Sequence, residues 1–269
     1  MNHLKAVVFD WAGTMIDFGS FAPMGVFVEA FSRFGIEVSI AEAREPMGRP
    51  KWDHIVAMLA QPRIRAAWEA KHKRTPTQMD VQAVYDVFVP LNEEVVSQFA
   101  DLVPGAAELV VAMRERQLKI GSTTGYTRSI MERVLPLAKA QGYEPDNLVC
   151  AGDLPYGRPT PMNMYQCFLD LQVWPAHAVV KVDDTGVGID EGREAGCWTV
   201  AVTLSGNEAG VTPEQLAAMS EEEVQKLRTH ASEVLGRHRP DYIIDTVADL
   251  LPVLNDIEQR LANGGRPKG

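Results

Sequence analysis

Short apolar runs alternate with segments of helical periodicity along most of the chain. Runs of this length, bounded by polar or Gly-containing segments, are typical of strands buried on both faces of a parallel sheet. The rhythm of strand and helix predicts an α/β fold, a doubly wound parallel sheet with helices on both faces. The expected strands are residues 5–9, 119–122, 147–151, 178–182, 198–202 and 242–244, and the expected helices are 104–116, 128–140, 161–171, 189–195 and 247–261, with an added helical pair at 212–235.

The segment from residue 18 to 102 has a different pattern. It shows helical periodicity without a convincing strand, and Met24 and Phe27 begin one apolar stripe. We therefore expect two domains, an α/β core formed by residues 1–17 and 103–269 and an all-helical cap formed by residues 18–102. The residues expected to divide the cap into short helices, or to kink them, are Pro62, Pro76 and Pro90.

Composition and charge exclude several classes of protein. The 269 residues are 46% hydrophobic and 23% charged, as in an ordinary globular protein with a full core. A net charge of −10 without a Lys/Arg-rich run argues against nucleic-acid binding. No stretch approaches the ~18 apolar residues of a membrane span, so no membrane partner is expected. The three cysteines form no CxxC pair, which indicates core residues in a reducing compartment and predicts a cytoplasmic protein.

Polar residues suited to phosphoryl transfer follow several of the expected strands. Asp10 follows the first, Thr124 the second, and the pair Asp183 and Asp184 the fourth. Loops at the carboxyl ends of parallel strands converge on one edge of the sheet. Acids that meet there need a cation between them, and oxygen ligands with open water positions suit Mg²⁺. Together with Arg158 these residues predict a phosphoryl-transfer site, although each alone could be a cap or turn residue.

The order of these residues resembles the four motifs of the haloacid dehalogenase superfamily, which also has a helical cap inserted after the first motif. The resemblance implies that the first aspartate attacks and that an acid two positions later protonates an oxygen leaving group. Here that later position is Ala12, so we do not expect an alkoxide leaving group that needs a proton from the core. The residues that carry the resemblance are Asp10 with Thr14, then Thr124, Arg158, and Asp183 with Asp184.

A lysine in the cap is a second candidate for covalent chemistry. It lies in the run MGRPKWDH, where Pro50 suits the first turn of a helix, so Lys51 is expected near the helix N-terminus. Met47, Lys51 and His54 share a face by their spacings of four and three. The helix dipole and Arg49 could lower the pKa of this lysine from its ordinary ~10.4 and make it a nucleophile. The alternative is a solvated helical lysine.

Ala12 and Lys51 together resemble the phosphonatase branch of the superfamily, the phosphonoacetaldehyde hydrolases. That branch combines Asp-Trp-Ala-Gly-Thr in the core with Met-Gly-x-x-Lys-x-x-His in the cap, and both patterns occur here, at residues 10–14 and 47–54. The resemblance implies cleavage of a carbon–phosphorus bond to give acetaldehyde and phosphate. Lys51 would form a Schiff base with the aldehyde, and Asp10 would attack phosphorus to give an aspartyl phosphate while the iminium accepts the electrons.

The resemblance also implies a role for each remaining site residue. Mg²⁺ would be held by Asp10, the backbone carbonyl of Ala12 and Asp184. Thr124 and Arg158 would hold the phosphoryl oxygens. The residues expected around the imine and the substrate are Met47, Gly48, His54 and Tyr126.

Two of these assignments have alternatives. Tyr126 could equally be a packing residue at the cap hinge. Some relatives carry a further acid four positions after the metal aspartate, where this chain has Gly188. Asp183 is the expected substitute beside the metal, and Asp190 is less expected because it should lie within the following helix.

The resemblance further implies a homodimer formed through the cap helices. Phe27, Phe31 and Trp68 are candidate contacts, although they could simply be core residues. Two other functions stay open. One is a haloacid dehalogenase or ester phosphatase of the same fold in which Lys51 is structural, and the other is a noncatalytic binding or scaffold protein. Only the noncatalytic protein would keep its biological effect after Asp10→Ala.

Overall fold

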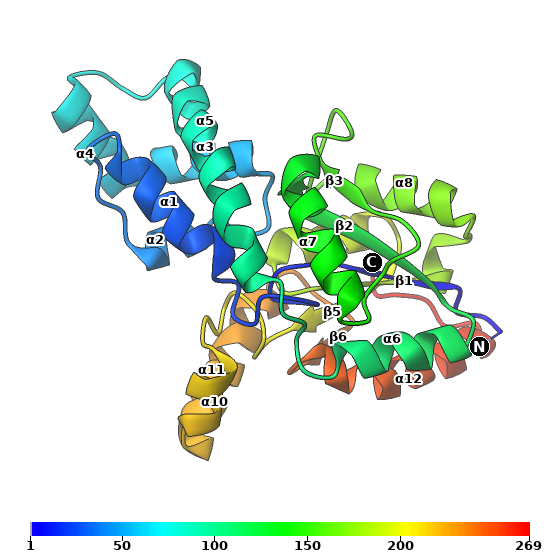
Figure 1. Cartoon of the computed structure of the whole chain (residues 1–269). Helices are drawn as coiled ribbons and strands as arrows, with labels where there is room; N and C mark the ends of the chain where they lie inside the picture. Colours follow the sequence, from blue (N-terminus) through cyan, green and yellow to red (C-terminus); the bar gives the residue numbers. More distant parts are fainter. Residues whose placement is uncertain (1) are drawn as a thin grey trace.

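A parallel sheet forms the centre of the computed structural model, which describes residues 2–269 (Figure 1). Its strands are β1 (Ala6–Phe9), β2 (Lys119–Thr127), β3 (Val149–Ala151), β4 (Val179–Asp183), β5 (Trp198–Val202) and β6 (Tyr242–Ile244). Their order across the sheet is β3-β2-β1-β4-β5-β6, and every pairing is parallel. The doubly wound α/β prediction is confirmed. Such sheets bind ligands beyond the carboxyl ends of the strands where the order reverses, here between β1 and β4.

Helices cover both faces of the sheet, because successive residues of a buried strand point to opposite sides. The helices of this part are α6 (Ala106–Glu115), α7 (Arg128–Ala140), α8 (Met162–Leu171), α9 (Gly186–Glu194), α10 (Pro213–Ala218), α11 (Glu221–Gly236) and α12 (Leu250–Ala262), with 3-10 turns η2 (Ala176–Ala178) and η3 (Val247–Asp249). Val7 and Phe9 of β1 pack in a cluster with residues of α6, α7 and α12. Ala6 and Val8 pack on the other face with α8. We call this part of the molecule the core.

The segment between β1 and α6 forms a group of helices with its own hydrophobic cluster, which Figure 1 shows beside the sheet in blue and cyan. Its elements are α1 (Ala22–Ser32), α2 (Ile40–Arg44), α3 (Lys51–Ala60), α4 (Pro62–His72), α5 (Gln78–Val95) and the 3-10 turn η1 (Val96–Phe99), which we call the cap. Phe27, Phe31 and Trp68 are buried inside this cluster. They are core residues of the cap, which is the second of the two alternatives that the sequence left open, and they do not reach the surface for a dimer contact.

Two antiparallel segments connect the cap to the core. The Asp17 N–H donates to the Asp101 carbonyl at 3.1 Å, and the Val103 N–H donates to the Met15 carbonyl at 2.9 Å. These bonds hold the outgoing and returning chains side by side. The cap also packs on the core beside this connection, because Ala22, Val96 and Ala100 belong to the core's hydrophobic cluster.

Some predicted boundaries need correction. Strand β2 continues beyond residue 122 to Thr127, where it still pairs with β3. Pro90 lies inside α5 and does not end it, because packing of α5 against α1 and α3 outweighs the lost hydrogen bond. Helix α9 begins at Gly186, three residues early, because the Thr185 side chain caps it. The last helix begins at Leu250 after the turn η3.

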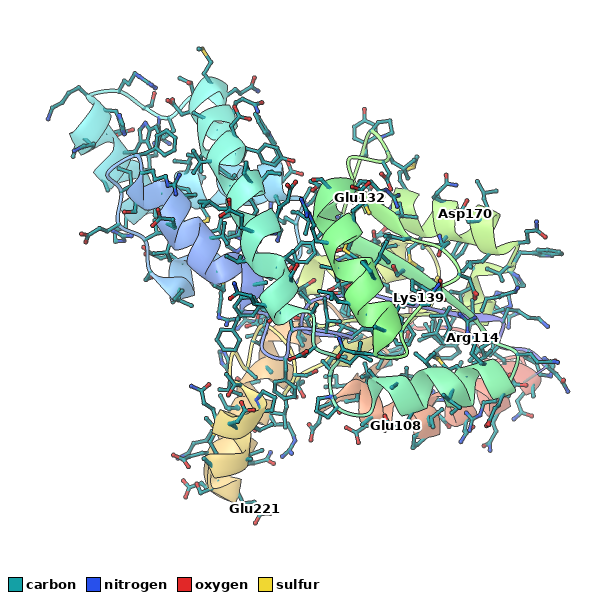
Figure 2. The ribbon with its side chains drawn as sticks, viewed as in Figure 1. Glu108, Arg114, Glu132, Lys139, Asp170 and Glu221 are labelled. Atoms are coloured by element: carbon teal, nitrogen blue, oxygen red, sulfur yellow. The ribbon has the colours of Figure 1, made fainter. Side chains whose placement is uncertain are left out.

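The expectations from composition concern the cysteines and the surface charges. Cys150, Cys167 and Cys197 are free and buried, as predicted. Charged side chains such as Glu108 and Lys139 lie on the outer surfaces of α6 and α7 (Figure 2). From residue 2 to residue 269, no helix has the length and apolar character needed to cross a membrane.

Candidate active site

Three acids meet at the switch point of the sheet. Asp10 directly follows β1. Asp183 is the last residue of the neighbouring strand β4, and Asp184 directly follows that strand. The Asp10 N–H donates to the Val182 carbonyl at 3.0 Å, which fixes the loop to that strand. All three acids are buried, and each offers a carboxylate oxygen within 4.8 Å of the others. The acids predicted from the sequence therefore converge at one point.

The electrostatics of this acid cluster fit a bound cation. Burial raises the pKa of Asp10 to about 6, and the charge of Asp183 adds to the effect. Burial and the charges of Asp10 and Asp183 hold the pKa of Asp184 well above its ordinary value. A bound divalent cation would compensate the negative charges of these carboxylates and lower their pKa values. Because the ligands offered are oxygens, the site suits a hard cation.

Asp183 differs from the other two acids because the core neutralises it. Its Oδ2 lies 3.0 Å from the Lys181 ammonium and 3.4 Å from Arg158 Nη2. The Thr185 hydroxyl donates to its Oδ1 at 2.7 Å. Burial raises the pKa of Asp183, but the charges of Arg158 and Lys181 outweigh it, so this pKa lies below its ordinary value. Asp10 and Asp184 are left as the acids with more need of a cation.

The Asp183 carboxylate also explains why residue 188 is a glycine. A Cβ at residue 188 would lie 1.9 Å from Asp183 Oδ2, so the Asp183 side chain occupies the space that a side chain at 188 would need. Asp190 lies within α9, as expected, and its carboxylate is 2.8 Å from His238 Nδ1. The structure thus brings Asp183, and not Asp190, to the acid cluster. His238 is thus the partner of Asp190.

A buried charge network lies beneath Asp10. Arg158 Nη2 is 2.8 Å from Asp10 Oδ1, and it donates to the Thr123 carbonyl at 2.8 Å. Glu191 holds the other end of this guanidinium, 3.2 Å from Nε, and accepts the Thr123 hydroxyl at 2.8 Å. Lys181 lies 3.4 Å from Glu191. The network aims Arg158 at the carboxylate that follows β1.

Sequence reasoning did not identify Lys181 or Glu191. Lys181 did carry a signal, because it interrupts the apolar run of β4, and a charge in a buried strand needs a partner. Glu191 lies on the buried side of α9, where an isolated helical sequence offers no comparable sign.

Lys51 occupies a different environment. It is the first residue of α3, directly after Pro50, and is only 3% exposed. Its ammonium lies 5.0 Å from the centre of the Tyr126 ring and 5.7 Å from that of Phe27. Burial lowers the pKa of Lys51 to about 8, and the charge of Arg158 adds to the effect while Asp10 opposes it. The expected lowering of the Lys51 pKa thus comes from burial and from Arg158, and not from Arg49.

His54 and Met47 take separate places. His54 Nε2 donates to the Ala43 carbonyl at 2.8 Å, and its ring stacks on Phe27 at 4.0 Å between centroids. Burial and the charge of Lys51 hold the pKa of His54 well below its ordinary value, so this imidazole is neutral. Met47 lies in the turn before α3, so the expected shared helical face holds only for Lys51 and His54.

Residues of the core and the cap line a small cavity of about 20 Å³, enough for roughly one water molecule. A Cβ at Gly48 would lie 2.3 Å from Thr185 Oγ1, and one at Gly125 would lie 2.8 Å from the Arg49 carbonyl oxygen, so the cap loop presses directly on the core. A cavity of this volume has no room for a molecule much larger than water. The predicted site residues on the cavity wall are Asp10, Ala12, Met47, Gly48, Lys51, Thr124, Tyr126 and Arg158.

Comparison with known proteins assigns the family. A family model described as a haloacid dehalogenase-like hydrolase matches residues 4–196. The chain belongs to the haloacid dehalogenase-like hydrolase family. It is 49% identical to the phosphonoacetaldehyde hydrolase of Paraburkholderia phytofirmans, over 99% of this chain and 100% of that one, and 47% identical to that of Bordetella pertussis, over 98% and 96%. A crystal structure of a phosphonoacetaldehyde hydrolase-like protein from Oleispira antarctica matches with a TM-score of 0.97 and 43% identity, over 99% of this chain and 96% of that one.

Membership in the haloacid dehalogenase-like hydrolase family makes this protein an enzyme, which overturns the noncatalytic alternative. The core of this hydrolase presents a carboxylate to the cavity, and its cap presents an amine of lowered pKa. A carboxylate can attack phosphorus, and a neutral amine can condense with a carbonyl group. A substrate that used both groups would carry a phosphoryl and a carbonyl group close together.

Proposed function

We propose that this hydrolase is a phosphonoacetaldehyde hydrolase that cleaves the carbon–phosphorus bond of its substrate to give acetaldehyde and phosphate. The observation that carries the proposal is that Lys51 and Asp10 line the same cavity between cap and core, with Ala12 where a proton-donating acid would stand. The names of relatives that match nearly the whole chain support it. An ester phosphatase or dehalogenase would have no use for the buried amine.

The first step of the proposed reaction takes place at the cap. Neutral Lys51 Nζ adds to the aldehyde carbon, and uptake of one proton with loss of water gives a protonated imine. This iminium accepts the electron pair of the carbon–phosphorus bond, which would otherwise leave on an unstable carbanion. The lowered pKa of Lys51 raises the fraction of neutral amine that can begin the reaction.

The second step takes place at the core. Asp10 attacks phosphorus in line with the carbon, giving an aspartyl phosphate and an enamine. Arg158 and Thr124 hold the phosphoryl oxygens and stabilise the charge that develops on them. One water then releases phosphate from Asp10. The enamine takes a proton on carbon, and a second water hydrolyses the resulting imine to acetaldehyde and free Lys51.

We assign the acid cluster to Mg²⁺. Asp10, Asp184 and the Ala12 carbonyl would hold it, and it would supply positive charge against the acids and the phosphoryl group. Its support is the all-oxygen set of buried ligands with raised carboxylate pKa values. Dialysis against a chelator is expected to abolish turnover, and added Mg²⁺ is expected to restore it.

Other residues have positioning roles in this proposal. The Tyr126 hydroxyl is buried and has no hydrogen-bond partner among residues 2–269, so it is available to the substrate or the imine. Gly48 lets the cap loop approach Thr185, and Met47 contributes to the apolar wall. His54 joins α3 to α2 through the Ala43 carbonyl and so fixes Lys51.

Domain motion and assembly belong to the same proposal. We propose that the cap, residues 18–102, opens and closes on the core, residues 1–17 and 103–269, to admit substrate and exclude water. We also propose a cytoplasmic homodimer through the cap helices. Exposed apolar side chains on the cap, such as Val56 and Met79, are available for that contact. Light scattering of the purified protein tests the dimer.

Borohydride trapping tests the proposed activity. The full chain is mixed with Mg²⁺, phosphonoacetaldehyde and borohydride, and a reduced adduct that maps to Lys51 by mass spectrometry is expected. Lys51→Arg, with its melting curve recorded, is the control and should give no adduct and no phosphate. Absence of an adduct in the folded wild-type protein, with turnover of a phosphate ester or a halo acid, would select the alternative phosphatase or dehalogenase.

A further inference from the structure

Arg44, the last residue of α2, spans the junction between cap and core. Its Nη1 donates to the Gly19 carbonyl at 2.8 Å, in the segment that leads into the cap. The same nitrogen lies 3.2 Å from the backbone carbonyl of Asn207 and 3.1 Å from its side-chain oxygen. Asn207 belongs to the core, in the loop after β5. One guanidinium thus joins the cap, the connecting segment and a core loop.

The core end of this contact reaches the acid cluster. The Asn207 N–H donates to Asp184 Oδ2 at 2.8 Å, and Asn207 is buried. Two residues earlier, the Ser205 hydroxyl donates to the Gly13 carbonyl at 3.0 Å, and the Ser205 carbonyl accepts the Gly19 N–H at 2.8 Å. The loop that carries Asn207 therefore touches Asp184, the loop after Asp10 and the connection to the cap.

Close packing fixes these parts together. A Cβ at Gly206 would lie 2.6 Å from Asp184 Cβ, and one at Gly210 would lie 3.1 Å from Arg44 Cζ. The Arg44 guanidinium also lies 5.0 Å from the centre of the Phe21 ring. A displacement of Arg44 would free the loop on both sides of Asn207.

We propose that Arg44 is a positioning residue that couples closure of the cap to the placement of Asp184, with Asn207 as the contact between them. If the cap rotates about its narrow connection, Arg44 moves with α2 while Asn207 stays beside β5, so their hydrogen bonds break together. The loop then loses its restraint, and the N–H that orients Asp184 is no longer held. The metal-site carboxylate is thus fully oriented only when Lys51 faces the core.

Hydrogen exchange of the full chain in Mg²⁺ tests the coupling without reference to any substrate. In Arg44→Ala, amides of residues 17–22 and 203–210 are expected to exchange about tenfold faster or more, because bonds to a charged group have been removed. Mg²⁺ affinity, measured by calorimetry, is expected to fall several-fold. Arg63→Ala is the matched control, because Arg63 is an exposed cap arginine that pairs with Glu42 within the cap. It should change neither quantity.

The catalytic readout rests on the proposed function. Arg44→Ala is expected to lower kcat/KM for phosphonoacetaldehyde by about tenfold to a hundredfold, and Arg44→Lys to recover part of it. Asn207→Ala removes the side-chain acceptor and keeps the N–H, so it serves as the second variant if Arg44→Ala does not fold. The effects of Arg44→Ala and Asn207→Ala should be less than additive when combined.

Two outcomes overturn the coupling. The first is that a folded Arg44→Ala or Asn207→Ala variant exchanges its amides and binds Mg²⁺ as the wild-type protein does. The second is that the effects of the two substitutions on kcat/KM are additive when they are combined. A wild-type protein that does not turn over phosphonoacetaldehyde overturns the proposed function alone, because exchange and Mg²⁺ binding still decide the role of Arg44.

Discussion

The core wall and the cap wall of the cavity treat buried charge in opposite ways. On the core wall, Asp10 contacts Arg158, and behind that wall Glu191 contacts both Arg158 and Lys181. On the cap wall, Lys51 faces aromatic rings, and among residues 2–269 no carboxylate is in ion-pair contact with it. The core thus orients charges by pairing them, whereas the cap lowers the pKa of Lys51 by burying its ammonium without a carboxylate in contact.

The difference indicates a division of labour. Paired charges in a dry site are held rigidly, which suits an attacking carboxylate and the groups that grip a phosphoryl. An unpaired buried ammonium is unstable, and the fall in the Lys51 pKa from 10.5 to about 8 corresponds to roughly 3 kcal/mol. That instability favours the neutral amine, which is the form that reacts with an aldehyde.

Asp10→Asn gives the largest expected effect and separates the two walls. Loss of the nucleophile should lower turnover by about 10⁴-fold or more, as for other covalent catalysts. Trapping of the aldehyde on Lys51 should persist, because the Asp10 charge raises the pKa of Lys51 and its removal lowers that pKa further. Phosphate release and adduct mass measure the two effects. Asp190→Asn, on the outer part of α9, should retain activity, and loss of trapping in Asp10→Asn would show that the walls do not act separately.

Glu191→Gln tests the paired charges of the core wall. The amide keeps the shape but leaves Arg158 and Lys181 with one counter-charge fewer in a buried site, so the free energy of unfolding should fall by about 3–5 kcal/mol. Urea denaturation measures it. Glu194→Gln, on the same helix with an exposed side chain, should change it by less than about 0.5 kcal/mol. Equal changes in the free energy of unfolding for the two variants would show that the buried charge network does not stabilise the core.

Lys51→Met is the matched variant on the cap wall, and its expected effect has the opposite sign. At pH 7 Lys51 is mostly charged, because its folded-state pKa of about 8 lies above that pH, so the burial of an unpaired charge destabilises the fold. This cost is present in full below pH 8 and fades as the pH rises toward the unfolded-state pKa. A Met should therefore increase the free energy of unfolding by about 1–3 kcal/mol at pH 7 while abolishing trapping. A destabilised variant would indicate an ion-pair partner for Lys51.

The sequence predicted those parts of the site that depend on short-range pattern. Asp10, Thr124 and Asp184 were found because apolar strands end at or near them, and Lys51 because its motif opens a helix. Strand β2 was predicted too short, since the polar residues before Thr127 hide its pairing with β3.

The unpredicted residues depend on contacts across the chain. Glu191 belongs to the site through its contact with Arg158, which lies on another element. Arg44 likewise reaches a loop more than 100 residues away in the sequence. No local pattern encodes such distances, because they follow from how the cap closes on the sheet. Asp183 was expected beside the metal, and the structure adds the reason that it fits there, since its carboxylate fills the space that a side chain at Gly188 would need.

The pH profile gives the smallest expected effect and tests the cap wall directly. If only neutral Lys51 condenses with the aldehyde, kcat/KM should rise about tenfold per pH unit from 6.5 toward a pKa of about 8 and then level off. Burial keeps two neighbours from titrating in this window, because the pKa of His54 lies well below its ordinary value and that of Tyr126 well above. The rate of borohydride trapping should follow the same curve, since it requires the same neutral amine. A midpoint near the ordinary ~10.4 of a solvated lysine would contradict the unpaired, buried state that distinguishes the cap wall from the core wall.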